Sequence, residues 1–134
     1  WELTEPLDVD GVGGRTLGAD PLVTAIAMSA HESGYDCDAI IVRKGSKGHG
    51  TDEFLETAGT LSAGDDIVAV DDVITTGGST LDAIEKMRDD GYVIRHAVCL
   101  VVREDVGAAA LADAGVELHP LFTLSQLLSF RGSK

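Results

Sequence analysis

The chain has few positive charges and no long hydrophobic run. Only four of its 134 residues are lysines, and its formal net charge is −13. Such acidity argues against general binding to nucleic acid, whose phosphates attract basic proteins. It is expected either of an ordinary acidic protein or of one adapted to high salt. The longest apolar run, near Ala97–Val102, is too short to span a bilayer, so no membrane partner is expected.

Cysteines and metal-ligand patterns are also scarce. Cys37 and Cys99 are far apart and lie beside or within hydrophobic segments, a pattern that predicts buried, reduced thiols rather than a disulfide or a metal site. The four histidines lack the spacing of zinc ligands. The first residues, Trp1–Pro6, are acidic and polar and do not resemble a signal peptide. We therefore expect a cytoplasmic protein.

Length and pattern predict one α/β domain over residues 1–134. At 44% hydrophobic residues the chain can bury a core, and alternating strands and helices imply parallel pairing. The expected helices cover 20–33, 79–90, 106–114 and 123–130, and the expected strands cover 38–43, 66–71, 92–102 and 116–119, with a loop at 44–60. Thr123 and Gln126 predict a capping box at the last helix.

The segment Ile67–Thr80 carries the strongest functional signal. Four hydrophobic residues precede Asp71 and Asp72, which places two carboxylates at the carboxyl end of a strand, where open α/β sheets bind ligands. A short Thr/Gly loop follows, whose N–H groups can surround an anion. Ser79 then begins a helix with a capping-type pair, and the helix N-terminus adds partial positive charge. The pattern suits a phosphorylated sugar, with carboxylates for its hydroxyl groups or Mg²⁺ and amides for its phosphate.

A basic loop follows the hydrophobic strand that ends at Val42. Three of the ten Lys and Arg residues, Arg43, Lys44 and Lys47, lie within five positions, and His49 comes shortly after. A cationic cluster in an acidic protein indicates an anionic ligand. The Gly and Ser residues between the charges are typical of a mobile loop that closes over a substrate.

Two further segments are candidates for ligand binding. Gly13–Pro21 is expected to be a glycine-rich loop before a helix, with Asp20 as the N-cap and Pro21 at the first helical position. Its glycine spacing differs from a dinucleotide fingerprint, and no strand is evident before it. Arg103 ends the hydrophobic run Val93–Val102, where a guanidinium can pair with a carboxylate.

Together these segments resemble the orotate phosphoribosyltransferases, within the type I phosphoribosyltransferase family. The run DD-x-x-TTGGS resembles the family's PRPP-binding motif, and R-K-x-x-K-x-H-G resembles its catalytic loop. The resemblance implies an α/β fold with a doubly wound, mainly parallel sheet flanked by helices. It also implies transfer of phosphoribose from PRPP to orotate in pyrimidine biosynthesis. The transition state would have oxocarbenium character, which requires positioning and charge stabilisation more than a protein nucleophile.

The resemblance also assigns roles to residues. Asp71 and Asp72 would contact the ribose hydroxyl groups, and Lys47 would neutralise charge on the departing pyrophosphate. Thr75 and Arg103 would contact orotate. The PRPP-binding set would be Arg43, Lys44, Lys47, His49, Asp71, Asp72, Val73, Ile74, Thr75, Thr76, Gly77, Gly78 and Ser79. No direct protein ligand for a metal is assigned, since Mg²⁺ would be held mainly through PRPP.

The sequence departs from the family pattern in places. Gly18 stands where several members have lysine, and Val102 replaces the acid before Arg103. We expect the family's N-terminal hood to be short or missing, either in a fragment or in a shortened member. A phosphoribosyltransferase for another nucleobase, or a PRPP- or nucleotide-sensing regulator without catalysis, are the alternatives. By resemblance, a homodimer that shares the catalytic loop is expected.

Overall fold

A six-stranded sheet forms the centre of the computed structural model, which describes residues 1–45, 54–57 and 60–130. The strand order is β3-β2-β1-β4-β5-β6, and all neighbouring strands are parallel except the pair β2 and β3. The strands are β1 (Gly11–Arg15), β2 (Asp38–Val42), β3 (Leu55–Thr57), β4 (Ile67–Ile74), β5 (His96–Val102) and β6 (Glu117–Thr123). This arrangement confirms the predicted doubly wound, mainly parallel sheet.

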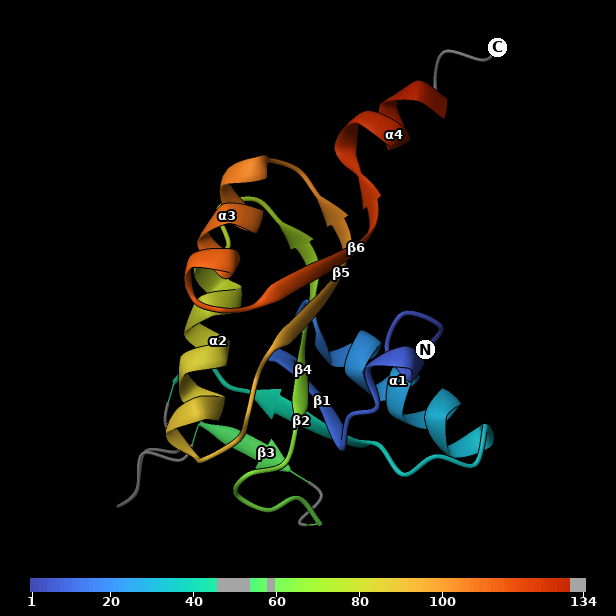
Figure 1. Ribbon diagram of the computed structural model, residues 1–134, viewed down its shortest axis with the longest axis vertical. Helices are drawn as coiled ribbons and strands as arrows, with labels where there is room; N and C mark the ends of the chain where they lie inside the picture. The colour runs from blue at the N-terminus through green and yellow to red at the C-terminus, as the bar shows by residue number, and fades with distance from the viewer. Residues whose placement is uncertain (46–53, 58–59, 131–134) are drawn as a thin grey trace.

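Helices cover both faces of the sheet (Figure 1). One face carries α1 (Asp20–Glu32), and the other carries α2 (Gly78–Asp89) and α3 (Asp105–Asp113). A short 3-10 helix, η1 (Glu5–Leu7), precedes β1, and α4 (Leu124–Ser129) follows β6 and projects beyond the sheet. None of the helices in the described ranges has the length and apolar character needed to cross a membrane.

Two apolar cores lie on the two faces because successive residues of a strand point to opposite sides. Ile67 and Ala69 of β4 pack toward Met87 of α2, while Val68 packs toward Val23 of α1. Ile67–Val70 of β4, which is buried on both faces, is therefore a continuous hydrophobic run, as expected for a parallel sheet. Cys37 and Cys99 are buried and form no disulfide, so the predicted burial of both thiols is confirmed.

The central strand β1 was not predicted. We expected Gly13–Pro21 to begin as a loop, but Gly11–Arg15 pairs with both β2 and β4. A Cβ atom at Gly13 would lie 2.4 Å from Met87 Sδ, and one at Gly14 would lie 2.3 Å from the Val70 carbonyl oxygen. Glycine is therefore required by close packing at the centre of the sheet, although it gives no strand signal in the sequence.

Other element boundaries also differ from the predictions. The predicted loop at 44–60 contains the edge strand β3. β4 continues beyond Asp71 to Ile74 because Val73 and Ile74 pair with β5. β5 begins at His96, and before it only an isolated bridge joins Val93 to Asp66.

At the carboxyl terminus, β6 runs on to Thr123 through Pro120. Proline is tolerated there because β6 is an edge strand. The last helix begins at Leu124 rather than 123, and Thr123 is its N-cap. The capping box of Thr123 and Gln126 is confirmed.

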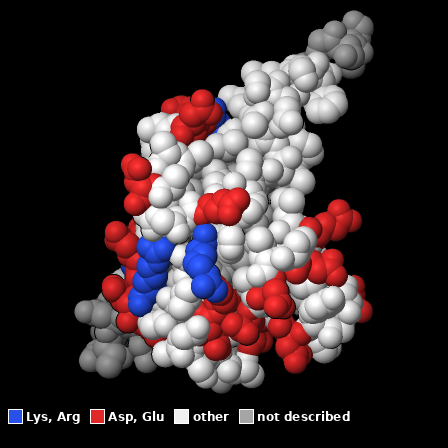
Figure 2. Space-filling view, viewed as in Figure 1, with Lys and Arg blue, Asp and Glu red and all other residues white. Residues whose placement is uncertain are grey.

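The surface is unevenly charged. Figure 2 shows acidic side chains gathered over α1 and the lower strands, while the surface over β6 and α4 carries few charges. Several large apolar side chains are exposed on that second surface, including Leu121 at 48%, Leu128 at 54% and Phe130 at 72%.

Candidate active site

The strand order reverses between β1 and β4, because the chain passes from β1 to β2 on one side and later adds β4 and β5 on the other. Ligands of open α/β sheets bind at such a switch point, beside the carboxyl ends of the strands. A cavity of about 430 Å³ lies there. It is lined by Arg15, Thr16, Leu17, Gly18, Lys44, Asp71, Asp72 and Ser79. The structure thus brings together parts of three segments that the sequence analysis had considered separately.

The two adjacent carboxylates lie in different environments. Asp71 is only 7% exposed, whereas Asp72 is exposed. Asp71 Oδ2 accepts hydrogen bonds from the hydroxyl groups of Thr80, at 2.7 Å, and Ser79, at 3.3 Å. Burial raises the pKa of the Asp71 carboxyl, and the Thr80 hydrogen bond opposes this shift. Asp71 therefore connects β4 to the start of α2, and Asp72 is the more accessible carboxylate.

The start of α2 differs from the expected capping pair. The helix begins at Gly78, and its N-cap is Gly77, with a φ of 81° and no side-chain cap. The hydroxyl groups of Ser79 and Thr80 bond to Asp71 instead of capping the helix. The first N–H groups of α2 thus lack a side-chain partner at the N-cap, and such helix ends bind phosphate groups.

The remaining residues of the predicted PRPP set differ in exposure. Val73 is 41% exposed, whereas Ile74 is 1% exposed and belongs to the core. Thr75 is half-buried, and Thr76 and Gly78 are exposed. Only the exposed members of this loop and its backbone are accessible to a ligand, so the side chain of Ile74 has a packing role.

The loop between β1 and α1 forms another wall of the cavity. Thr16 Oγ1 donates a hydrogen bond of 2.7 Å to Asp20 Oδ2. The predicted N-cap at Asp20 is wrong, because Ala19 is the N-cap and Asp20 is the first helical residue. A Cβ atom at Gly18 would lie 2.9 Å from Asp72 Oδ1. The absence of a side chain therefore allows this loop to approach the accessible carboxylate.

Basic side chains reach the cavity from the end of β1 and from the segment after β2. Arg15 and Lys44 line it. Arg15 Nη1 is 3.6 Å from Asp82 Oδ2, and Lys86 Nζ is 3.0 Å from the same oxygen. Lys86 also donates to the Arg43 carbonyl oxygen at 3.4 Å. Lys86 thus connects α2 to the beginning of the basic loop, a role that the sequence analysis missed although Asp82 and Lys86 have helical i,i+4 spacing.

The other basic residues of the prediction are placed less directly. Arg43 forms an ion pair with Glu56 of β3 at 2.9 Å and does not line the described cavity. Lys47 and His49 lie outside the described residues. Arg103 is exposed just beyond β5, and its backbone N–H donates to the Ile74 carbonyl oxygen at 2.8 Å. The Arg103 backbone is therefore adjacent to the end of β4, near Thr75.

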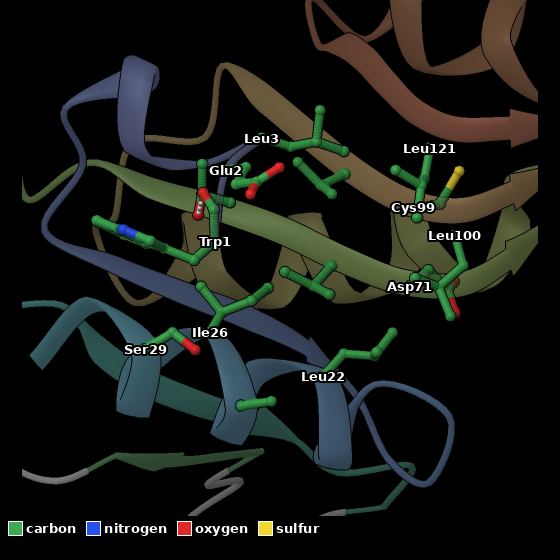
Figure 3. A pocket seen from close by; sticks show the side chains of 14 residues that line it. Trp1, Glu2, Leu3, Leu22, Ile26, Ser29, Asp71, Cys99, Leu100 and Leu121 are labelled. Atoms are coloured by element: carbon green, nitrogen blue, oxygen red, sulfur yellow. Dashed lines mark hydrogen bonds between the residues drawn. The ribbon is translucent and has the colours of Figure 1, made fainter. Parts of the chain in front are cut away.

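A second, more apolar cavity of about 610 Å³ lies beside α1 and shares Asp71 with the first cavity (Figure 3). Its lining includes Trp1, Leu3, Leu22, Ile26, Val98 and Leu121. In Figure 3, Trp1 lies at one end of this cavity, and Asp71 lies with Leu100 at the other. This cavity was not predicted from the sequence, because its residues come from segments far apart in the chain.

The sheet order, the loop after β4 and the switch-point cavity define a type I phosphoribosyltransferase fold, and solved structures of this class are similar to the chain. The orotate phosphoribosyltransferase of Thermosynechococcus vestitus is 44% identical over 119 residues, which are 89% of this chain and 62% of that protein. The enzyme of Aeropyrum pernix has a TM-score of 0.75 and 33% identity, with 98% of this chain and 73% of that chain covered.

The Mycobacterium tuberculosis enzyme in complex with 5-phospho-α-D-ribosyl 1-diphosphate (PRPP) has a TM-score of 0.79 and 33% identity. That comparison covers 94% of this chain and 69% of the other. No protein-family model matches the chain. The chain belongs to the orotate phosphoribosyltransferase family, and it spans about three fifths of the length of the first curated relatives that it matches.

Proposed function

We propose that the chain is the catalytic domain of an orotate phosphoribosyltransferase. It transfers phosphoribose from PRPP to N1 of orotate and releases pyrophosphate, giving orotidine 5′-monophosphate in pyrimidine biosynthesis. The observation that carries the proposal is the cavity at the switch point, where Asp72, Ser79, Lys44 and Arg15 line one space. Such a cavity combines carboxylate, hydroxyl and cationic groups, as a sugar with two phosphorylated positions requires.

In this proposal PRPP lies across the carboxyl ends of β1 and β4. The exposed carboxylate of Asp72 binds ribose hydroxyl groups, and Asp71 supports it from the more buried position. The 5′-phosphate is bound by the Thr75–Ser79 segment, where the uncapped N-terminus of α2 supplies N–H groups and partial positive charge.

Cationic residues bind the pyrophosphate. Lys44 lines the cavity, and Lys47 and His49 follow it in the same loop. Arg43 would leave its ion pair with Glu56 to take part. Lys47 stabilises the charge that develops on the departing pyrophosphate, which is an interaction made mainly in the transition state. Arg103, at the same edge of the sheet, binds the orotate carboxylate together with Thr75.

The residues at the site fit Mg²⁺ as the cofactor. The carboxylates of Asp71 and Asp72 are hard oxygen donors, the type that Mg²⁺ prefers, and Asp72 is exposed enough to reach a hydrated ion. Bound together with PRPP, Mg²⁺ supplies positive charge that stabilises pyrophosphate as a leaving group.

We further propose a cytoplasmic homodimer in which each catalytic loop contributes to the partner's site. The unpaired, buried cysteines suit a reducing compartment. The exposed apolar side chains of β6 and α4, among them Leu121 and Leu128, supply a surface that a second protein surface could cover.

The first test is turnover of PRPP, Mg²⁺ and orotate, followed as loss of orotate absorbance. We expect activity in the wild type and a loss of kcat of at least about 100-fold in Lys47→Ala. Lys134→Ala, which removes a lysine near the carboxyl end of the printed sequence, is the matched control and should keep the wild-type kcat. Unchanged kcat in Lys47→Ala would exclude the loop from the mechanism. Binding of PRPP without turnover of orotate would direct the test to other bases and then to a sensing role.

A further inference from the structure

Two histidines and a glutamate come together across β5 and β6. His96 is directly opposite Glu117 in the strand register, and His119 lies two residues further along β6. Because alternate residues of a strand share one face, Glu117 and His119 project from the same side of the sheet. His96 Nδ1 is 3.1 Å from His119 Nε2 and 3.8 Å from Glu117 Oε2. The three ligand atoms all lie within 4.8 Å of one another, and within residues 1–45, 54–57 and 60–130 no other group of three His, Cys, Asp or Glu residues does so.

We propose that His96, Glu117 and His119 bind a divalent transition-metal ion, with Zn²⁺ as the typical occupant. Two imidazole nitrogens and one carboxylate oxygen form a known zinc ligand set that leaves a fourth position for water. With bonds of about 2.0–2.2 Å, two ligands of a tetrahedral ion lie about 3.3–3.6 Å apart. The separations of 3.1 and 3.8 Å in the structure are on either side of this range.

The protonation of the pair also favours a metal. At most one proton can lie between the facing nitrogens of His96 and His119, so one ring already directs a lone pair at the other. A metal ion takes the place of that proton and accepts both lone pairs, while the displaced proton moves to the remote nitrogen of the same ring, so both imidazoles bind as neutral ligands. The Glu117 side chain is 70% exposed, so it can rotate to complete the set and water can reach the fourth position.

The ligand chemistry separates this site from the proposed Mg²⁺ site. Imidazole nitrogen suits zinc, copper and nickel, whereas Mg²⁺ prefers oxygen ligands. His96 lies three positions before Cys99, which is paired with Asp71 of β4, so the site is about 10 Å further toward the amino end of the sheet. A bound ion would link the edge strand β6 to β5. The metal site does not depend on the proposed transferase function.

The test is titration of the metal-free protein with Zn²⁺, measured by calorimetry and by competition with a coloured chelator. We expect one ion per chain in the wild type and an affinity at least about 100-fold lower in His96→Ala and His119→Ala, because losing a ligand costs more than losing a supporting group. His31→Ala removes an exposed histidine on α1 and should bind as the wild type does. Mg²⁺ in excess should not displace Zn²⁺.

A second measurement does not rely on affinity alone. Substitution of Co²⁺ should give a ligand-field spectrum in the wild type and in His31→Ala that is lost in His119→Ala. Zn²⁺ should also raise the unfolding temperature of the wild type and leave that of His119→Ala unchanged. Equal Zn²⁺ affinity in the wild type, His96→Ala and His119→Ala would overturn the proposal, as would the same cobalt spectrum in all of them. Circular dichroism of each variant identifies any that fail to fold, in which case Glu117→Gln on β6 replaces it.

Discussion

Adjacent aspartates at the switch point have different tasks because they differ in burial. Asp71 is nearly enclosed and bonded to the hydroxyl groups of Thr80 and Ser79, whereas Asp72 is exposed beside the cavity. Removal of a buried acceptor leaves its donors unsatisfied, while removal of an exposed group does not. The sequence motif gives the two residues the same role, and only the structure separates structural support from ligand contact.

We expect Asp72→Asn to lose activity without losing stability. A hydrogen bond between a charged group and its partner contributes about 1.5–3 kcal/mol, so kcat/KM for PRPP should fall roughly 10- to 150-fold. The unfolding temperature should remain that of the wild type, because the side chain is exposed. Steady-state kinetics and thermal unfolding of the same preparation test both parts. A large loss of stability in Asp72→Asn would contradict the division of tasks.

Asp71→Asn should instead change how stability depends on pH. Burial raises the pKa of Asp71 in the folded protein above its ordinary value of 3.8, so the folded state binds this proton more readily than the unfolded state. The group therefore stabilises the wild type at low pH, and this contribution is lost as pH rises through the raised pKa. Asparagine does not titrate, so the wild type should gain stability relative to the variant as pH falls within that window.

Urea unfolding of the wild type and Asp71→Asn from about pH 4 to about pH 8 measures this difference. The other carboxylates are common to both proteins, so their contributions to the pH dependence of stability cancel in the difference. A difference that stays constant over the whole range would show that the pKa of Asp71 is not raised.

Gly18 is a further residue whose effect should pass through Asp72. A Cβ atom there would lie 2.9 Å from Asp72 Oδ1, so Gly18→Ala should displace that flexible carboxylate and raise KM for PRPP several-fold. The test is a double-mutant cycle, because contacting residues show non-additive effects. In an Asp72→Asn background Gly18→Ala should cost less than in the wild type. Additive losses would mean that Gly18 acts by another route.

At the scale of elements, hydrophobic pattern predicted most helices and strands but missed β1 and β3. β1 has the sequence Gly-Val-Gly-Gly-Arg, which lacks strand propensity because neighbours on both faces leave no room for side chains. β3 has three residues, with one partner strand. Propensity reflects local preference, whereas both strands depend on tertiary pairing.

Gly14→Ala tests whether packing selects the glycines of β1. The added Cβ would lie 2.3 Å from both Ala19 Cβ and the Val70 carbonyl oxygen, so backbone must move, and we expect destabilisation of at least about 1–3 kcal/mol. Urea unfolding gives the value. Gly78→Ala is the matched control, because its Cβ would meet nothing closer than 3.8 Å and alanine favours a helix. Equal stability of Gly14→Ala and the wild type would show that the sheet centre tolerates a side chain.

The candidate site was predictable only in parts, because a sequence pattern expresses contacts between neighbours in the chain and not contacts made by tertiary pairing. Short motifs contain the loops after β4 and β2, since those residues are neighbours in the chain. Contacts between strands, such as Arg43 with Glu56 and His96 with His119, depend on register, which spacing along one sequence does not express. The histidines therefore lacked any zinc-ligand pattern in the sequence, although the sheet places them side by side.

For the molecule as a whole, the dominant feature is its net charge of −13. Acidic groups gather over α1 and the lower strands in Figure 2, while the surface over β6 and α4 carries few charges and is partly apolar. Like charges on a compact surface repel one another, and this repulsion destabilises the folded state. Salt weakens it, because the screening length falls from about 10 Å at 0.1 M to about 3 Å at 1 M.

We therefore expect the unfolding temperature to rise by several degrees between about 0.05 M and about 1 M NaCl. Equimolar uncharged osmolyte is the control, since it stabilises by exclusion from the surface without screening charge. If screening is the whole cause, the rise should flatten above roughly 0.5 M, where the screening length is already shorter than most distances between surface charges. A rise that continues through molar salt would favour adaptation to high salt over ordinary acidity. An unfolding temperature that falls or stays constant would mean that repulsion between these carboxylates does not limit the stability of the fold.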